Sequence, residues 1–183
     1  MQMNPNSDFS AIMGKVATEL YHGLTWHCEA ANQMRKIGLR GFGRLHEYNG
    51  KHDFERLGEL KKILGDRLEI YPDIDASNIP KALTFTMNNV SDLKPHLEAW
   101  CNAEYAFCET LKTAVKMAAD EDMCVYSELI GILNDVEEEI MRLNILKKRL
   151  AIGEYGGHDI ARVSKDLHKH FEHHPERGLD FDV

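Results

Sequence analysis

Four acidic residues, each near the middle of a helical pattern, are the residues of this sequence best placed for chemistry. Glu19, Asp53, Glu104 and Glu139 lie on or beside the apolar positions, spaced three and four residues apart, that a helix turns toward a core. A carboxylate there loses its hydration, which is unfavourable unless a cation, a partner charge or a proton compensates it. Four converging carboxylates would repel one another unless cations lie between them.

Carboxylates on facing helices of a bundle are a common way to hold a pair of iron or manganese ions. Hard oxygen ligands suit iron(II), manganese(II) or magnesium, and thiolate pairs of the CxxC type are absent from the sequence. His22 lies one turn after Glu19, so both side chains can reach one ion or one hydrogen bond. Arg56 lies one turn after Asp53 and can pair with it instead. The residues alone leave metal binding and ion pairing open.

Four long helical patterns carry one acid each. The apolar spacing predicts helices over residues 9–37, 39–64, 91–119 and 122–152, with Asp122 as the N-cap of the fourth. Between the second and third helices, residues 65–90 lose this periodicity and contain Tyr71-Pro72 and Ile79-Pro80, which disfavour helix. A connection this long is unusual unless it crosses the length of a bundle. We therefore predict an all-α, four-helix bundle with a long crossover between its second and third helices.

A short fifth helix is predicted after the glycines at positions 153, 156 and 157. It covers residues 159–171 and has one apolar edge, formed by Ile160, Val163, Leu167 and Phe171. We divide the chain into the bundle, residues 1–152, and a histidine-rich C-terminal helix and tail, residues 153–183. A helix this short is marginal alone, so it must pack on its own bundle or on a neighbouring subunit. The glycines favour the neighbouring subunit, and we expect this helix to help hold an oligomer.

The composition and charge of the chain argue against several classes of function. The chain has 183 residues, 28% of them charged, and a net charge of −8, which disfavours a nucleic-acid binder. No run of 18 apolar residues indicates a membrane span, and the first 14 residues do not resemble a signal peptide. The four cysteines form no recognisable disulfide framework, as expected for buried or free thiols in a reducing compartment. These features predict a cytoplasmic protein without a membrane partner.

From about residue 16 to residue 153, the sequence resembles the ferritin-like family. Glu19-Leu20-Tyr21 is similar to the first-helix ligand motif of that family, and residues 52–56 are similar to its second-helix ligand segment. Ala103-Glu104 and residues 133–140 are similar to the corresponding parts of its third and fourth helices. The resemblance implies that Glu19 and Glu104 are terminal metal ligands and that Asp53 bridges two metal ions. Glu139 matches a position that is histidine in the bacterioferritin branch.

The function implied by this resemblance is the binding and oxidation of iron(II) at a dinuclear carboxylate centre, which makes a ferroxidase-type enzyme the leading hypothesis. The implied cofactor is dinuclear iron, with manganese as the other candidate metal. Iron storage or detoxification in an oligomeric shell would follow if many copies assemble, so the implied partners are metal ions and further copies of the chain. Residues 1–14 contain no Lys or Arg, unlike the lysine-rich ends of DNA-binding mini-ferritins, so nucleic acid is not expected as a partner.

One departure from the family pattern leaves two hypotheses open. The second helix should read carboxylate-x-x-histidine, but here Arg56 stands in the histidine position, and arginine cannot ligate a metal. Arg56 could neutralise the buried carboxylates, which would give a metal-free ferritin-like structural or binding bundle. Alternatively Arg56 turns outward, and His22, His46 or His52 supplies the nitrogen ligand.

Overall fold

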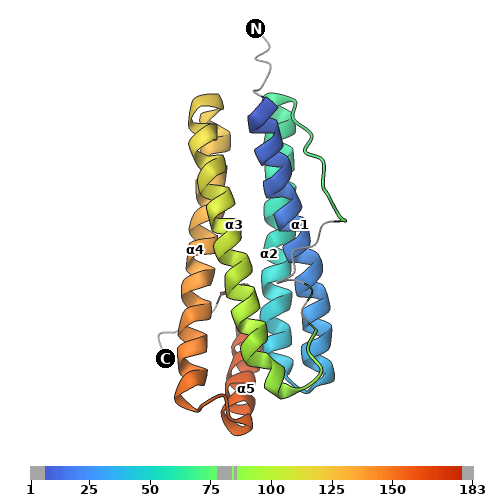
Figure 1. Ribbon diagram of the computed structural model, residues 1–183, viewed down its shortest axis with the longest axis vertical. Coiled ribbons are helices and arrows are strands. Elements are labelled where there is room, and N and C mark those ends of the chain that lie inside the picture. Colours follow the sequence, from blue (N-terminus) through green and yellow to red (C-terminus); the bar gives the residue numbers. More distant parts are fainter. Residues whose placement is uncertain (1–6, 78–83, 85, 179–183) are drawn as a thin grey trace.

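Four long helices and a shorter fifth make up the fold. The computed structural model describes residues 7–77, 84 and 86–178. The elements are α1 (Ser7–Lys36), α2 (Arg40–Leu68), the short 3-10 helix η2 (Val90–Asp92), α3 (Leu93–Glu121), α4 (Met123–Ile152) and α5 (Gly157–His173). The four long helices lie side by side with α5 at one end (Figure 1). The predicted all-α bundle is confirmed, with helix boundaries within a few residues of the expected ones.

The connection after α2 must span the length of the bundle, because α2 ends at one end and α3 begins near the other (Figure 1). Two hydrogen bonds attach its described parts to α1. The backbone N–H of Asp75 donates to Thr18 Oγ1 at 3.0 Å, and that of Met87 donates to Gln33 Oε1 at 2.8 Å. The predicted crossover between the second and third helices is therefore present, and α2 and α3 run in the same direction.

Side-chain caps fix the ends of the later helices. Asp122 accepts hydrogen bonds from the backbone N–H groups of Cys124 and Val125, which confirms it as the N-cap of α4. Before α3, Asn89 and Asp92 cap each other's backbone and open the single turn of η2. None of the helices in the described ranges is long and apolar enough to span a membrane.

The buried core consists of two apolar clusters with a layer of polar side chains between them. One cluster contains residues of α1 up to Leu20, of α2 from Leu57 onward, of α3 from Phe107 onward and of α4 up to Ile140. The other begins at Trp26 on α1 and contains residues of α2 to α5. Between them lie buried polar side chains of the middle turns: His22, His27, His46, Asn49, Asp53, Arg56 and Glu139. The two clusters keep water away from this layer on both sides.

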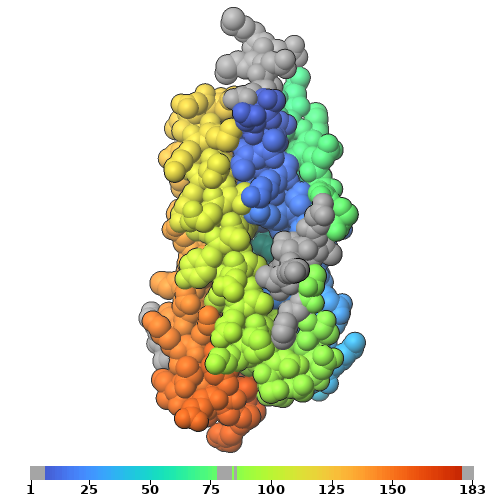
Figure 2. All heavy atoms as spheres, viewed as in Figure 1, coloured from blue at the N-terminus to red at the C-terminus, as the bar shows by residue number. Residues whose placement is uncertain are grey.

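Helix α5 folds back onto its own bundle, where it mainly contacts α2. The side chains of its apolar edge, Ile160, Val163, Leu167 and Phe171, are at most 5% exposed. In a space-filling view, α5 and the adjoining end of α4 share one end of the molecule with the start of α3 (Figure 2). The expectation that this edge packs on a neighbouring subunit is therefore wrong. Its apolar surface is already covered within the chain, so any contact with another copy would use the outer, polar side of α5.

Gly41 lets α5 approach the backbone of α2 closely. A Cβ atom at position 41 would lie only 1.8 Å from the backbone oxygen of Ser164, and the Gly41 N–H donates to Ser164 Oγ at 3.2 Å. No side chain fits there without moving α5. The small residue at this position explains how a short helix gains a well-packed interface.

We predict that Gly41→Ala destabilises the protein by about 1–3 kcal/mol, because the added methyl group overpacks the interface between α2 and α5. The matched control is Gly58→Ala on the same helix, where a Cβ atom meets nothing within 4 Å. That control should stabilise the protein by about 0.5–1 kcal/mol through helix propensity. Urea unfolding monitored by circular dichroism measures both changes. Equal stability of the two variants would contradict the proposed role of Gly41.

Candidate metal centre

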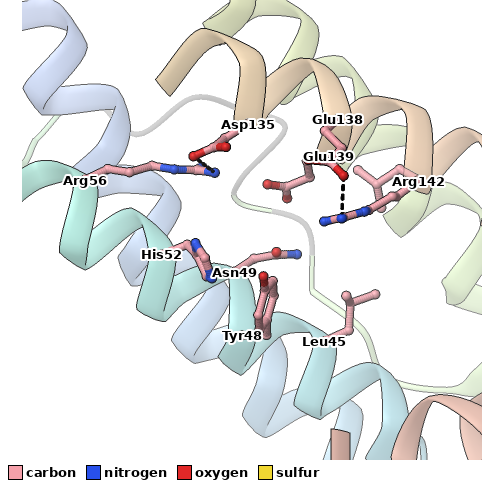
Figure 3. A pocket seen from close by; sticks show the side chains of 10 residues that line it. Leu45, Tyr48, Asn49, His52, Arg56, Asp135, Glu138, Glu139 and Arg142 are labelled. Atoms are coloured by element: carbon pink, nitrogen blue, oxygen red, sulfur yellow. Dashed lines mark hydrogen bonds and ion pairs between the residues drawn. The ribbon is translucent and has the colours of Figure 1, made fainter. Parts of the chain in front are cut away.

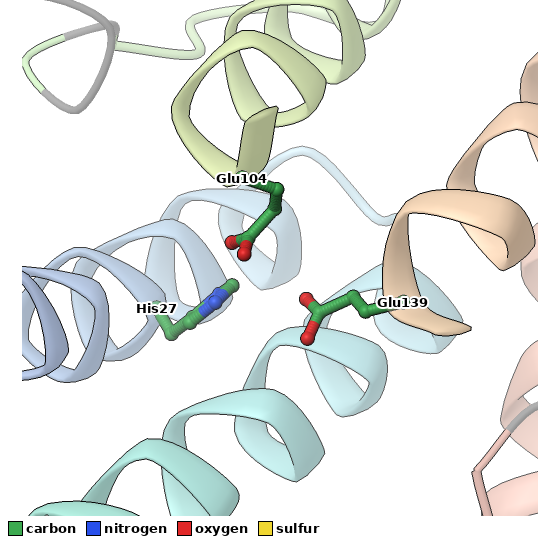
Figure 4. A group of neighbouring side chains, drawn as sticks. All are labelled: His27, Glu104 and Glu139. Carbon is green, nitrogen blue, oxygen red and sulfur yellow. The ribbon is translucent and has the colours of Figure 1, made fainter. Parts of the chain in front are cut away.

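Side chains from three helices meet in the polar layer between the apolar clusters. His27 of α1, Glu104 of α3 and Glu139 of α4 each offer one donor atom, and these three atoms all lie within 4.8 Å of one another. The three side chains point toward a common space between the helices (Figure 4). Atoms that bind one ion at about 2.0–2.2 Å lie up to about 4.4 Å apart. Small side-chain movements would therefore bring all three onto one ion.

Asp53 of α2 lies next to this group. Its Oδ2 atom is 3.8 Å from Nε2 of His27. Gly23 on α1 makes room for this carboxylate, because a Cβ atom at position 23 would lie 2.4 Å from Asp53 Oδ2. Asp53 and Glu139 are both buried, at 8% and 9% exposure. All four helices of the bundle thus contribute to one buried polar cluster.

His27 is the residue of this site that the sequence analysis did not select. It occupies an apolar position of the first helix, where a histidine is usually a core residue satisfied by hydrogen bonds. The structure shows that its Nδ1 atom bonds to Nδ1 of His46 at 2.8 Å, while Nε2 faces the carboxylates. A sequence signal was present, since His27 lies eight residues after Glu19 and therefore on the same helix face.

Glu19 and His22, two predicted ligands, lie together in a neighbouring pocket between α1 and α3. Asp53 and Glu104 also line this pocket. Glu19 Oε1 accepts a hydrogen bond from Thr110 Oγ1 at 3.1 Å. Glu19 Oε2 and His22 Nε2 are buried without a hydrogen-bond partner. Both atoms are therefore available to a bound ion or water molecule in this pocket.

His52, the remaining predicted ligand, lies on the other side of the cluster. It is half-buried, and its ring contacts that of Tyr48 at 4.4 Å between centroids with the planes tilted by 44°. It lines a pocket between α2 and α4 (Figure 3). Glu139 and Arg56 reach the same pocket from its inner side. Within the described part of the chain, the compact donor group contains His27, Glu104 and Glu139 but not His52. The predicted carboxylate ligands therefore lie closer to one another than the predicted histidine ligands do.

Arg56 points into the bundle, so the alternative in which it turns outward is wrong. Its side chain is 10% exposed, and its two terminal nitrogens lie 3.4 Å from Asp53 Oδ1 and 3.4 Å from Asp135 Oδ2. Figure 3 shows the guanidinium reaching from α2 toward Asp135 on α4. A fixed positive charge therefore stands beside Asp53, at the place where the family pattern has a metal-binding histidine.

Burial favours the protonated forms of the carboxylates of the cluster. It raises the pKa of Glu104 well above its usual value, and the charges of Glu139 and Asp53 raise it further. Burial and repulsion by Glu139 likewise raise the pKa of Asp53, and the nearby guanidinium of Arg56 does not offset them. Burial raises the pKa of Glu139 to about 7 although Arg56 lowers it. The single guanidinium is too little positive charge for three buried carboxylates.

A dication fits this charge distribution. When ionised, the carboxylates of Asp53, Glu104 and Glu139 outnumber the single guanidinium of Arg56, which also pairs with Asp135, so a divalent ion would offset the excess negative charge. Burial lowers the pKa of His27 to about 3, so this imidazole is neutral and has a lone pair to offer. Glu139 Oε1 is buried and has no hydrogen-bond partner. Oxygen donors with one imidazole suit iron(II), manganese(II) or zinc.

Comparison with solved structures identifies the fold as ferritin-like. An open-pore ferritin from the archaeon Archaeoglobus fulgidus superposes with a TM-score of 0.74 at 13% identity, covering 88% of this chain and 96% of that one. An engineered closed form of the same ferritin gives a TM-score of 0.68 at 14% identity, covering 88% and 95%. A humanised archaeal ferritin gives 0.72 at 15% identity, covering 88% and 94%.

No protein-family model matches the sequence, and a comparison with curated proteins also finds no match. The resemblance therefore extends over nearly the whole bundle in three dimensions while the sequences have diverged. At these identities the comparison establishes the fold, and the chemistry must be argued from the residues of the cluster.

We predict that Glu139→Gln changes the pH dependence of stability in the metal-free protein. The pKa of Glu139 is higher in the folded chain, so folding takes up a proton between about pH 4.5 and pH 7. The stability of the wild type therefore falls as the pH rises through this window, and the glutamine variant lacks that loss. Between pH 5 and pH 8, the free energy of unfolding of the variant should therefore rise by about 2 kcal/mol relative to that of the wild type.

Urea unfolding with a chelator present measures this difference, and Glu138→Gln, at an exposed position of α4, is the matched control. A relative stability of Glu139→Gln that stays constant from pH 5 to pH 8 would show that Glu139 is not protonated by burial.

Proposed function

We propose that this protein binds iron(II) inside the bundle and oxidises it, with manganese(II) as the other metal that the ligand set suits. The observation that carries the proposal is the convergence of His27, Glu104 and Glu139 in a buried cluster with excess negative charge. Iron is the substrate, and each iron(II) gives one electron to dioxygen or peroxide. Hard anionic oxygens favour the higher charge of the ferric product. The ferritin-like fold supports this choice of metal.

The first ion position in this proposal lies between His27, Glu104 and Glu139. His27 binds through Nε2, because Nδ1 is already bonded to His46. Glu104 accepts a hydrogen bond from Trp100 Nε1 at 3.2 Å, which fixes the orientation of its carboxylate. An ion here would take the place of the protons that burial favours on the two glutamates, so metal binding and protonation compete at this site.

A second ion position, which a dinuclear centre requires, is proposed in the pocket between α1 and α3. Glu19 and His22 would bind the ion there, and Asp53 or Glu104 would link it to the first position. This position departs from the predicted arrangement, in which Asp53 bridges both ions and His52 is a candidate ligand. The guanidinium of Arg56 stands on the His52 side of Asp53 and repels a cation there.

Oligomeric assembly completes the proposal. Two of the similar structures are an open-pore ferritin and an engineered closed form of that ferritin. We propose that this chain also assembles with copies of itself, so that oxidised iron is kept in a shared interior. The exposed outer faces of the helices, rather than the apolar edge of α5, would make the contacts. A cytoplasmic location stays a prediction from the sequence.

The inward position of Arg56 favours a second candidate function. If this guanidinium and bound protons satisfy the carboxylates, the protein is a metal-free ferritin-like bundle with a structural or binding role. Burial lowers the pKa of Arg56, but attraction by Glu139, Asp53 and Asp135 outweighs it, so the side chain stays charged. Metal analysis of the purified protein separates the two functions, since the second predicts much less than one ion per chain.

We predict that iron(II), added without oxygen at pH 7.5, raises the melting temperature by about 5–10 °C at a hundredfold excess over its Kd, because it binds only the folded chain. Admitting air should then produce ferric absorbance faster than in buffer alone. Glu104→Gln should lose most of the shift and of the rate. Glu109→Gln, at an exposed position of α3, is the matched control. No shift with iron(II) or manganese(II) would favour the metal-free bundle.

The number of ions is a separate prediction. Calorimetric titration with manganese(II) should give two equivalents per chain, one tighter than the other. Glu19→Gln should remove the weaker equivalent and leave the tighter one, because Glu19 lies outside the group formed by His27, Glu104 and Glu139. A single equivalent in the wild type would restrict the proposal to the first ion position. Two equivalents retained in Glu19→Gln would exclude Glu19 as a ligand.

A further inference from the structure

Three buried histidines from three helices form a hydrogen-bonded row that ends at the candidate metal centre. Nδ1 of His27 lies 2.8 Å from Nδ1 of His46, and Nε2 of His46 lies 2.9 Å from Nε2 of His96. Each of these rings is at most 1% exposed. At the other end of the row, Nε2 of His27 faces Asp53. We refer to His27, His46 and His96 as the histidine row.

Burial disfavours a positive charge on all three rings. Burial lowers the pKa of His27 to about 3 and that of His96 to about 4, and it also holds the pKa of His46 well below its usual value. A neutral imidazole has one N–H donor and one acceptor nitrogen. Each short contact between two nitrogens must contain one proton, since two facing lone pairs or two facing N–H groups would repel. These conditions couple the tautomers of the three rings.

With one proton on each ring, only two arrangements of protons satisfy both contacts. In the first, His46 donates from Nδ1 to His27, so the proton of His27 is on Nε2 and points at the carboxylates, while His96 donates from Nε2 to His46. In the second, His27 donates from Nδ1 to His46, His46 donates from Nε2 to His96, and His96 has its proton on Nδ1. The second arrangement leaves Nε2 of His27 with a free lone pair toward Glu104 and Glu139.

Aromatic packing prevents the rings from flipping, and a flip is the movement that would uncouple their tautomers. His46 stacks on Trp100 with centroids 4.3 Å apart and planes at 25°, and His96 stacks on Trp26 at 5.1 Å and 19°. Trp26 also meets His46 edge-on at 5.2 Å. A ring flip would require these close-packed side chains to separate. A change at His27 therefore reaches the other two rings through their protons.

We propose that His46 and His96 are positioning residues for the metal centre, and that an ion bound at His27 Nε2 selects the second proton arrangement in the whole histidine row. This inference rests on the proposed function. On ion binding, solvent water takes the proton from Nε2 of His27, one proton moves from Nδ1 of His46 to Nδ1 of His27, one moves from Nε2 of His96 to Nε2 of His46, and solvent water supplies one proton to Nδ1 of His96. The row has three ring protons before and after, so its charge does not change.

His46 then orients His27 as the partners of ligating histidines commonly do. By accepting the Nδ1 proton, it fixes both the tautomer and the plane of the ring that binds the ion. His96 in turn accepts from His46, so the effect of the row extends two rings away from the ion. Loss of such a partner typically lowers metal affinity about 10- to 100-fold.

The first test reads the tautomers directly in the full-length protein labelled with nitrogen-15. Long-range proton–nitrogen spectra at pH 7.5 assign the protonated nitrogen of each ring, first without metal and then with zinc(II) as a diamagnetic probe. The expected result is that zinc(II) places the protons on Nδ1 of His27, Nε2 of His46 and Nδ1 of His96. Zinc(II) binding with the protons of His46 and His96 on the opposite nitrogens would overturn the proposal while leaving the proposed function intact.

A pair of variants at position 46 supplies the second test. His46→Phe keeps an aromatic ring against Trp100 but removes both nitrogens, and His46→Asn loses the ring but keeps an acceptor oxygen near the place of Nδ1. If His46 acts through its hydrogen bond, zinc(II) affinity falls about 10- to 100-fold in His46→Phe and less in His46→Asn. If its role is packing alone, the order is reversed, and that order would overturn the proposal.

Calorimetry measures the affinities, and urea unfolding without metal shows that both variants are folded. Zinc(II) that fails to bind even the wild type would overturn the proposed function together with this inference. Unchanged affinity in His46→Phe would overturn this inference alone.

Discussion

The burial of three carboxylates within reach of a single guanidinium is the constraint on which the rest of this structure depends. Asp53, Glu104 and Glu139 are removed from water, and Arg56 offsets only part of their charge. A dry interior makes each unpaired charge more unfavourable, so the cluster must hold either protons or cations. The apolar clusters on both sides make the bundle stable enough to tolerate this layer.

The close approach of α1 and α2 sets the distances in that layer. Added Cβ atoms at Gly23, Gly43 and Gly50 would lie 2.4 Å from Asp53, 3.2 Å from the backbone of Ala31 and 3.1 Å from Cβ of His27, respectively. Small residues at these three positions let the two helices lie nearly in backbone contact. His27 can therefore reach both Asp53 and His46. Larger residues would separate the helices and break the link between the carboxylates and the histidine row.

Much of the fold could be predicted from the sequence, because apolar spacing reports directly which side of each helix faces a core. The four helices, the crossover and the inward placement of Asp53 and Glu139 follow from that spacing. Spacing within one helix does not report which residues of different helices meet. The sequence does not mark His27 and His96 as partners, and only the relative placement of α1, α2 and α3 shows that their rings bond through His46. The direction of Arg56 and the docking of α5 likewise depend on contacts between helices.

The charge of Arg56 also bears on the choice of His27, Glu104 and Glu139 as the proposed ion position. A guanidinium beside Asp53 supplies a charge that cannot be removed by pH, and it repels any cation placed on the same side of that carboxylate. In the proposed centre the ion lies instead where Glu104 and Glu139 face His27. The proposed nitrogen ligand then comes from the first helix, because position 56 of the second helix is an arginine, which cannot ligate a metal. Arg56 leaves the carboxylates with excess negative charge, which is the property that would attract an ion to this layer.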